Sequence, residues 1–241
     1  MIVKRVIVIV VMFIVIFVAT GCAASQSNVS RFADIQTGDV ISFGKYEQDG
    51  DGWNGQEDIE WKVLKIENDK ALIVSNYVLD CQPYNTTWTV VTWESCSLRK
   101  WLNESFYFEA FSESERNSIL ETTVINKEYP QSGAKAGNTT KDKVFALSVE
   151  EVQTLFYSSA TTRTTGTAYA ESKGLFVFNG KAGWWLRTPG GGYGVSSSAA
   201  GASNASYVRR DGTVDWLSVD FGHGTDREFI GVRPALWISL E

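Results

Sequence analysis

The only histidine of the chain, His223, lies in a short segment with three acidic residues, Asp220, Asp226 and Glu228. An imidazole beside a carboxylate and a serine is the set that a hydrolytic triad needs, and serines are plentiful here. The same side chains also suit a cation. The chain has no Gly-x-Ser-x-Gly motif, however, and a glycine on each side of His223 is typical of a loop. We therefore assign no catalytic residue and keep a cell-envelope hydrolase that uses His223 as an alternative.

A second acidic stretch, residues 48–58, carries Asp49, Asp51 and Glu57 among three glycines. Calcium prefers several carboxylate and carbonyl oxygens from one tight loop. The spacing is not that of an EF-hand, because the glycine and the final glutamate are misplaced. We therefore expect a hairpin turn between two strands, with calcium as the alternative and no other cofactor or metal.

Aromatic and acidic side chains near the C-terminus are the candidate ligand-binding residues. They are Tyr193, Tyr207, Trp216, Asp220, His223 and Asp226. Outward-facing Trp and Tyr beside Asn and Asp suit stacking on sugar rings, although nine Trp can also fill the core of a strand-rich domain. Strand alternation predicts that Trp184, Trp185, Trp216 and Trp237 divide between core and surface.

Two arginines, Arg187 and Arg233, lie inside apolar strand-like runs. An unpaired charge there costs on the order of several kcal/mol. We therefore expect structural ion pairs with acids such as Asp215, Asp220 or Glu60, and anion recognition in a pocket is the alternative.

The N-terminus has the pattern of an export signal. Lys4 and Arg5 precede an unbroken apolar run over residues 6–19, and Gly21 and Cys22 follow closely. This run is short for a membrane span and suits a signal-peptide core. A cysteine at this place resembles the bacterial lipoprotein signal, whose thiol receives a diacylglyceryl group, so we expect Cys22 to anchor the chain to the outer face of the membrane. An ordinary signal peptide or an anchor helix is the alternative.

The remaining cysteines are Cys81 and Cys96. A compartment outside the cytoplasm permits a disulfide between them, and two reduced thiols are the alternative, because spacing alone does not fix distance. A zinc site is not expected, since the chain has one histidine and no Cys-x-x-Cys motif.

Three segments follow from these observations: a signal peptide (1–21), a tether (22–31) and a single extracytoplasmic domain (32–241). A 44% hydrophobic content is ample for one large core. The formal net charge of −6, without a basic block, excludes nucleic acid as an expected partner.

The order of elements is typical of an α+β domain, with antiparallel strands at both ends and a few short helices in the middle. Residues 59–66 and 70–76 flank a turn at 67–69 and predict a hairpin. Ser112 and Ser148 each precede a glutamate by three positions and predict capping boxes. Residues 143–147 read as a short strand. Apolar runs that begin at residues 184, 207 and 231 predict C-terminal strands, which must meet the early hairpin to form a core.

Six motifs resemble a bacterial family, the domain of unknown function 6273. They are DVISFGKY (39–46), IEWKVL (59–64), DCQPYN (80–85), TWESCSLRKWLN (92–103), WWLRTPG (184–190) and GVRPALWI (231–238). The resemblance runs from about residue 32 to the end and implies a surface location, because this family occurs in secreted and anchored proteins. It implies no particular chemistry.

The C-terminal third also resembles C-type-lectin-like domains of the formylglycine-generating-enzyme type, with a Trp-Leu strand, a variable loop, an Asp-Gly hairpin and a closing strand. That resemblance implies a ligand face at residues 190–206 and 217–228. It does not imply the enzyme activity, because no cysteine follows Cys96. We expect a lipid-anchored binding module for a carbohydrate, a peptide or a surface protein, with a structural surface domain as a further alternative.

Overall fold

The computed structural model describes residue 32 and residues 34–128, 134–191, 204–218 and 229–241. Its main element is a four-stranded antiparallel sheet in the order β1-β2-β3-β11. The strands are β1 (Val40–Tyr46), β2 (Glu57–Glu67), β3 (Lys70–Ser75) and β11 (Ala235–Ser239). The early hairpin and the last strand therefore meet, as the need for a shared core predicts.

The turn between β2 and β3 has a local cause. Asn68 and Asp69 adopt φ values of 47° and 56°, the left-handed conformation that a tight two-residue hairpin turn requires. Asn and Asp tolerate this conformation better than most residues. The predicted hairpin is confirmed.

Short helices fill the middle of the chain. They are α1 (Ser97–Trp101), the π-helical turn η1 (Leu102–Phe106), α2 (Tyr107–Ala110), α3 (Glu113–Ser118), α4 (Val149–Leu155), α5 (Ser159–Thr162) and α6 (Ala168–Ser172). Ser112 and Glu115 form the predicted capping box of α3, and Ser148 and Glu151 form that of α4. The strand predicted at 143–147 is wrong. The short strand lies earlier, at β5 (Thr140–Asp142), which pairs with β4 (Thr122–Val124).

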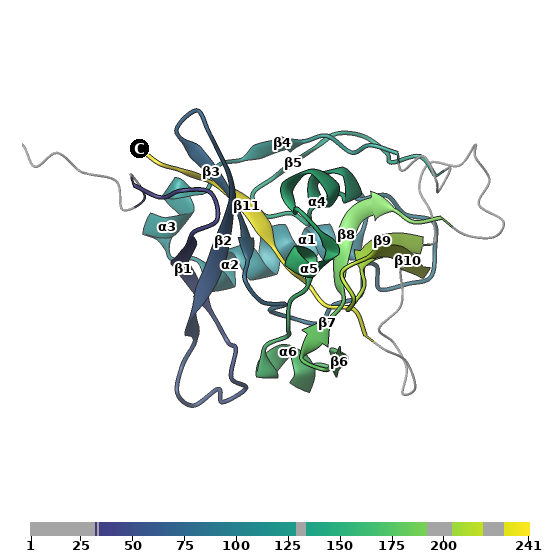
Figure 1. Ribbon diagram of the computed structural model, residues 1–241, viewed down its shortest axis with the longest axis horizontal. Helices are drawn as coiled ribbons and strands as arrows, with labels where there is room; N and C mark the ends of the chain where they lie inside the picture. Colours follow the sequence, from purple (N-terminus) through teal and green to yellow (C-terminus); the bar gives the residue numbers. More distant parts are fainter. Residues whose placement is uncertain (1–31, 33, 129–133, 192–203, 219–228) are drawn as a thin grey trace, which may run out of the picture.

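A second sheet has the order β10-β9-β8, from β8 (Trp184–Pro189), β9 (Asn204–Val208) and β10 (Val214–Ser218). Figure 1 draws it beside the first sheet, with α4 and α5 between them. Gly231 bridges to Trp184 and Val232 bridges to Asp80, so the segment before β11 connects the two sheets. A small hairpin of β6 (Val177–Phe178) and β7 (Lys181–Ala182) precedes β8.

Large aromatic side chains dominate the core. Trp61, Trp93, Trp184 and Trp185 are fully buried, whereas Trp216 on β10 is 36% exposed. The predicted alternation is wrong for the adjacent pair Trp184 and Trp185, because every residue of β8 is buried and the strand is covered on both faces. No helix within the described ranges combines the length and the apolar character that crossing a bilayer requires.

Candidate functional site

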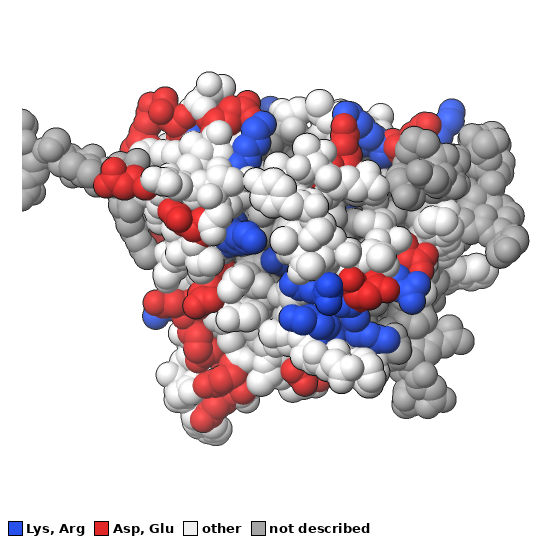
Figure 2. Space-filling model, viewed as in Figure 1, with Lys and Arg blue, Asp and Glu red and all other residues white. Residues whose placement is uncertain are grey.

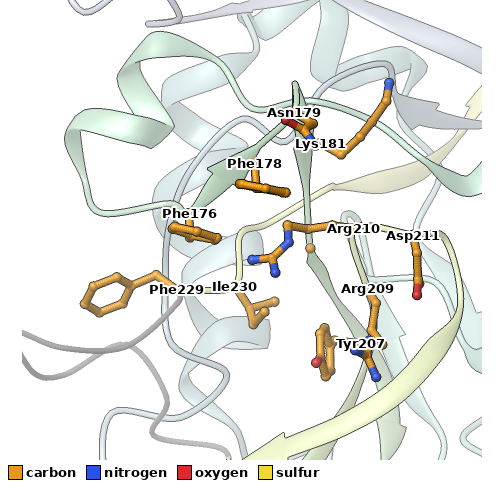
Figure 3. Close-up of a pocket in the computed structure, with 11 residues that line it drawn as sticks. Phe176, Phe178, Asn179, Lys181, Tyr207, Arg209, Arg210, Asp211, Phe229 and Ile230 are labelled. Carbon is orange, nitrogen blue, oxygen red and sulfur yellow. The ribbon is translucent and has the colours of Figure 1, made fainter.

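A surface hollow of about 290 Å³ lies between the β6–β7 hairpin and the β9–β10 hairpin. We call it the Arg210 pocket. Its lining consists of Phe176, Phe178, Asn179, Lys181, Gly183, Tyr207, Arg209, Arg210, Asp211, Phe229 and Ile230. Figure 3 shows the guanidinium of Arg210 between the rings of Phe176 and Phe178 on one side and Ile230 on the other. The pocket thus combines aromatic walls with cationic groups.

The β6–β7 hairpin supplies one wall. Asn179 and Gly180 have φ values of 50° and 66°, which makes an Asn-Gly turn of the tight kind that joins adjacent strands. Phe178 and Lys181 are register partners across this turn, so their side chains lie on the same face of the hairpin. The Asn-Gly turn therefore places Phe178 and Lys181 at the pocket, although the Lys181 side chain extends past Asn179, away from the Arg210 guanidinium (Figure 3).

The β9–β10 hairpin supplies the opposite wall. Its turn is closed by hydrogen bonds from the Arg209 amide to the Thr213 carbonyl (2.7 Å) and from the Gly212 amide to the Arg209 carbonyl (2.8 Å). The carboxylate of Asp211 accepts hydrogen bonds from the amide and the hydroxyl of Thr213. The turn therefore holds Arg209 and Arg210 in place beside the pocket.

Gly212 fixes how closely this turn packs on α5. Its φ is 87°, and a β-carbon at this position would lie 1.8 Å from the carbonyl oxygen of Ser159. The Thr162 hydroxyl donates to the Gly212 carbonyl at 2.8 Å. Only glycine fits both the left-handed conformation and the contact with α5.

Arg210 is held by aromatic rings. Its guanidinium carbon lies 4.5 Å from the centroid of the Phe176 ring and 5.8 Å from that of Phe178. These distances are within the range of cation–π attraction. The stacking orders a long side chain that would otherwise sample many rotamers, so Arg210 is preorganised in the pocket.

Positive charge gathers at this site although the chain as a whole is acidic. The described lining carries Lys181, Arg209 and Arg210 against a single carboxylate, Asp211. The pKa of Asp211 is lowered, first by its hydrogen bonds with Thr213 and then by the charges of Arg209 and Arg163. Figure 2 shows Lys and Arg side chains clustered where Figure 1 places α5 and β7, while acidic side chains lie toward the β1–β2 loop.

The structure describes two of the six predicted ligand-binding residues. Tyr207 lines the Arg210 pocket. Trp216 does not, because its register partner on β9 is Ser206, so Trp216 and Tyr207 point to opposite faces of the sheet. The other four predicted residues, Tyr193, Asp220, His223 and Asp226, lie outside the described residues, as does Cys22.

The pairing predicted for the two strand arginines is wrong in detail. Arg187 pairs with Glu151 at the start of α4, with Nη1 and Nη2 at 2.5 and 2.9 Å from its two carboxylate oxygens. Burial opposes the ionised form of Glu151, but the hydrogen bonds and charge of Arg187, with help from Ser148, lower the pKa of Glu151 overall.

Arg233 has no carboxylate partner among the described residues. It donates to the carbonyls of Ser75 (2.8 Å) and Thr162 (3.3 Å) and lies 5.0 Å from the centroid of the Trp184 ring. Burial lowers its pKa to about 9. Backbone carbonyls and aromatic rings therefore stabilise this charge in place of the expected acid.

Both domain cysteines are free thiols. The Cys81 thiol donates to the carbonyl of Ile230 at 3.7 Å, and the Cys96 thiol donates to that of Trp93 at 3.4 Å. Cys96 also caps α1, since its sulfur accepts a hydrogen bond from the Arg99 amide. Burial raises the pKa of each thiol to about 12.

Most of the acidic stretch at 48–58 lies in the connection between β1 and β2, and its last two residues, Glu57 and Asp58, begin β2, as the hairpin interpretation predicts. Carboxylate oxygens of Glu47, Asp49 and Glu57 lie within 4.8 Å of one another. Backbone amides already bind these carboxylates, since Glu57 accepts from Gln48 and Asp49, and Glu47 accepts from Gly50. The loop is therefore organised by its own hydrogen bonds.

Residues 68–240 match the family model described as a domain of unknown function, DUF6273. No curated protein and no solved structure matches the chain.

Proposed function

The chain belongs to the DUF6273 family, and we propose that it is a lipid-anchored binding module. The name of this family assigns no activity, so we infer the role from the chain's own residues. The observation that carries this proposal is the Arg210 pocket, in which aromatic rings and cations line one surface hollow. A concave site in which aromatic walls and polar groups converge is a typical place for a ligand to bind. The ligand is a carbohydrate, a peptide or a surface protein of the cell envelope.

Exposed aromatic side chains support a binding role for this pocket. Phe176 and Phe178 are 37% and 57% exposed, although burial of such rings is favourable by ~1.5–3 kcal/mol. A ligand that covers these rings would recover part of that free energy. We also propose a C-type-lectin-like fold, which is supported by the return of β11 to the early hairpin and by the β9–β10 hairpin of the second sheet, whose turn carries Asp211 and Gly212.

Binding to fractionated cell envelope tests the function. The full chain in detergent micelles would be mixed with separate polysaccharide, peptidoglycan and surface-protein fractions. We expect Phe178→Ala to weaken binding to one fraction at least tenfold. Trp53→Ala is the matched control, because Trp53 is 98% exposed and does not line the pocket. Equal binding by both variants would place the ligand elsewhere, and no binding to any fraction would support a structural domain.

Membrane anchoring has its own test. We expect Cys22→Ser to prevent lipid attachment and to move the protein from the membrane pellet to the soluble fraction. Cys81→Ser is the control, since this cysteine lies in the folded domain beside Ile230. Retention of Cys22→Ser in the membrane pellet would contradict a lipid anchor.

A further inference from the structure

A second hollow, of about 230 Å³, lies between β4 and the start of α4, with Arg187 of β8 and Trp237 of β11 in its lining. We call it the Arg187 groove. It shares no lining residue with the Arg210 pocket and is a site additional to the proposed function. We infer that the Arg187 groove binds an extended peptide, which pairs with the free edge of β4 and offers a main-chain carbonyl to Arg187.

The groove runs along one edge of β4. Residues 122–125, on β4 and directly after it, all line the groove. Successive side chains of a strand point to opposite faces, so a hollow lined by four successive residues follows the edge of the strand. β5 pairs with β4 but does not line the groove. The groove therefore lies at the opposite edge, which has no strand partner among the described residues and is a template for an added strand.

One donor of Arg187 lacks an acceptor. The side chain is buried, its Nη1 donates to the carbonyl of Ala146 at 2.9 Å, and Nη1 and Nη2 bind the carboxylate of Glu151. The Nε atom is also buried, and it has no hydrogen-bond partner in the part of the chain that the structure describes. A buried donor without an acceptor is costly in free energy, so a ligand that supplies an acceptor here is favoured.

The charges around the groove favour a neutral acceptor. Glu151 pairs with Arg187, and Glu150 pairs with Lys127 at 2.8 Å, so the described lining carries two cations and two anions. A further carboxylate would lie close to Glu151 and be repelled by it. A main-chain carbonyl is neutral, and an added strand presents such carbonyls along the edge that it pairs.

Apolar surface beside the strand edge suits a side chain of the peptide. Ile125 is 60% exposed, and Phe145 and Trp237 also line the groove. A water molecule would satisfy the Nε–H of Arg187 but would cover neither Ile125 nor the edge of β4. An extended peptide with an aliphatic side chain serves all three, since its main chain pairs and its side chain covers apolar surface.

Selection from a library of random heptapeptides, capped at both ends, tests the inference on the full chain in detergent micelles. Methylation of the selected peptide's amides along the edge that pairs with β4 should weaken binding at least tenfold, because it removes the donors. Methylation of the alternate amides, which point away from β4, is the matched control and should change the affinity less than twofold. Selection of no peptide, or equal losses from the two methylation patterns, would overturn the inference.

Variants connect the peptide to the groove. Ile125→Asp should weaken peptide binding at least tenfold, because a carboxylate replaces the apolar surface at the strand edge. Val40→Asp is the matched control, since Val40 is a 53% exposed aliphatic residue on β1, the edge strand of the first sheet. Loss of peptide binding in Phe178→Ala but not in Ile125→Asp would place the peptide in the Arg210 pocket and overturn the inference.

Proton–nitrogen NMR follows Arg187 without a substitution. Binding of the selected peptide should move the Nε–H proton resonance of Arg187 downfield, because the donor gains an acceptor. Arg233 is the internal control, since its Nε already donates to the carbonyl of Ser75 at 2.8 Å. A bound peptide that leaves the Arg187 resonance unchanged would overturn the inference.

Discussion

The hydroxyl of Tyr46 on β1 donates a 2.6 Å hydrogen bond to a carboxylate oxygen of Asp80, in the segment that follows β3. The other carboxylate oxygen accepts from the Cys81 amide and from the side chain of Gln82. Burial raises the pKa of Asp80, and these hydrogen bonds limit the rise. The same carboxylate helps to raise the pKa of Tyr46, second to burial itself.

Asp80 predicts a pH dependence of stability. In the folded chain the pKa of Asp80 is raised above 3.8, the ordinary value, which applies to the unfolded chain. At pH values between the ordinary pKa and the raised pKa, Asp80 therefore binds more protons in the folded state than in the unfolded state. The contribution of Asp80 to the free energy of unfolding therefore falls as pH rises. In urea titrations from about pH 3.8 to neutrality, wild type should lose stability relative to Asp80→Asn. Asp34→Asn, at an exposed acid, is the control, and a constant difference for Asp80→Asn would contradict the prediction.

The Arg187–Glu151 pair predicts a large cost for removing one partner. Glu151→Gln retains the capping-box residue type but leaves the buried guanidinium without a carboxylate, which costs ~3–5 kcal/mol. Lys127→Gln, which breaks the exposed Lys127–Glu150 pair, should cost less than ~1 kcal/mol. Chemical denaturation measures both, and similar losses would show that burial does not set the cost.

Two glycines at positive φ predict different costs for a methyl group. Gly180→Ala meets no atom within 4 Å and should lose only the ~1–2 kcal/mol of left-handed strain. Gly212→Ala meets the Ser159 carbonyl at 1.8 Å, so the β9–β10 turn must move away from α5. Its loss of unfolding free energy should be at least twice that of Gly180→Ala. A thermal unfolding series measures both, and equal losses would mean that the turn moves freely.

The two free thiols predict low reactivity in the folded protein. The thiolate is the reactive form, and pKa values of about 12 leave little of it at neutral pH. Alkylation by iodoacetamide, followed by mass spectrometry on the peptides with Cys81 and Cys96, should be at least tenfold slower in the folded chain than in urea. Equal rates in the two states would show that the thiols are accessible and activated.

Local sequence signals were sufficient for the hairpin at Asn68 and Asp69 and for the caps at Ser112 and Ser148. These features depend on a few adjacent residues. The partners of Arg187 and Arg233 were not predictable in the same way, because Glu151 and Trp184 reach them only through the fold. Sequence spacing carries no information on such distant contacts.

The sequence analysis covers the candidate site only in part. Tyr207, predicted as a ligand-binding residue, lines the Arg210 pocket, whereas Phe176, Phe178 and Lys181 on the other wall are not among the predicted residues. A signal for that wall exists in the sequence, since two phenylalanines alternate before Asn179 and Gly180, as in a hairpin. The cation–π arrangement of Arg210 has no local signal, because it joins two different hairpins.

The pairing of β3 with β11 also means that the first sheet cannot be completed until the end of the chain has been made. From Ser75 to Ala235 the chain gains 160 residues before the fourth strand of the sheet exists. At about 5–20 residues per second of synthesis, the edge of β3 that later pairs with β11 keeps its hydrogen-bonding groups unpaired for roughly 8–32 s. Such long-range pairing is slow, and an open strand edge invites pairing with other chains. A newly made chain therefore leaves this edge of β3 without its sheet partner until the last strand has been made.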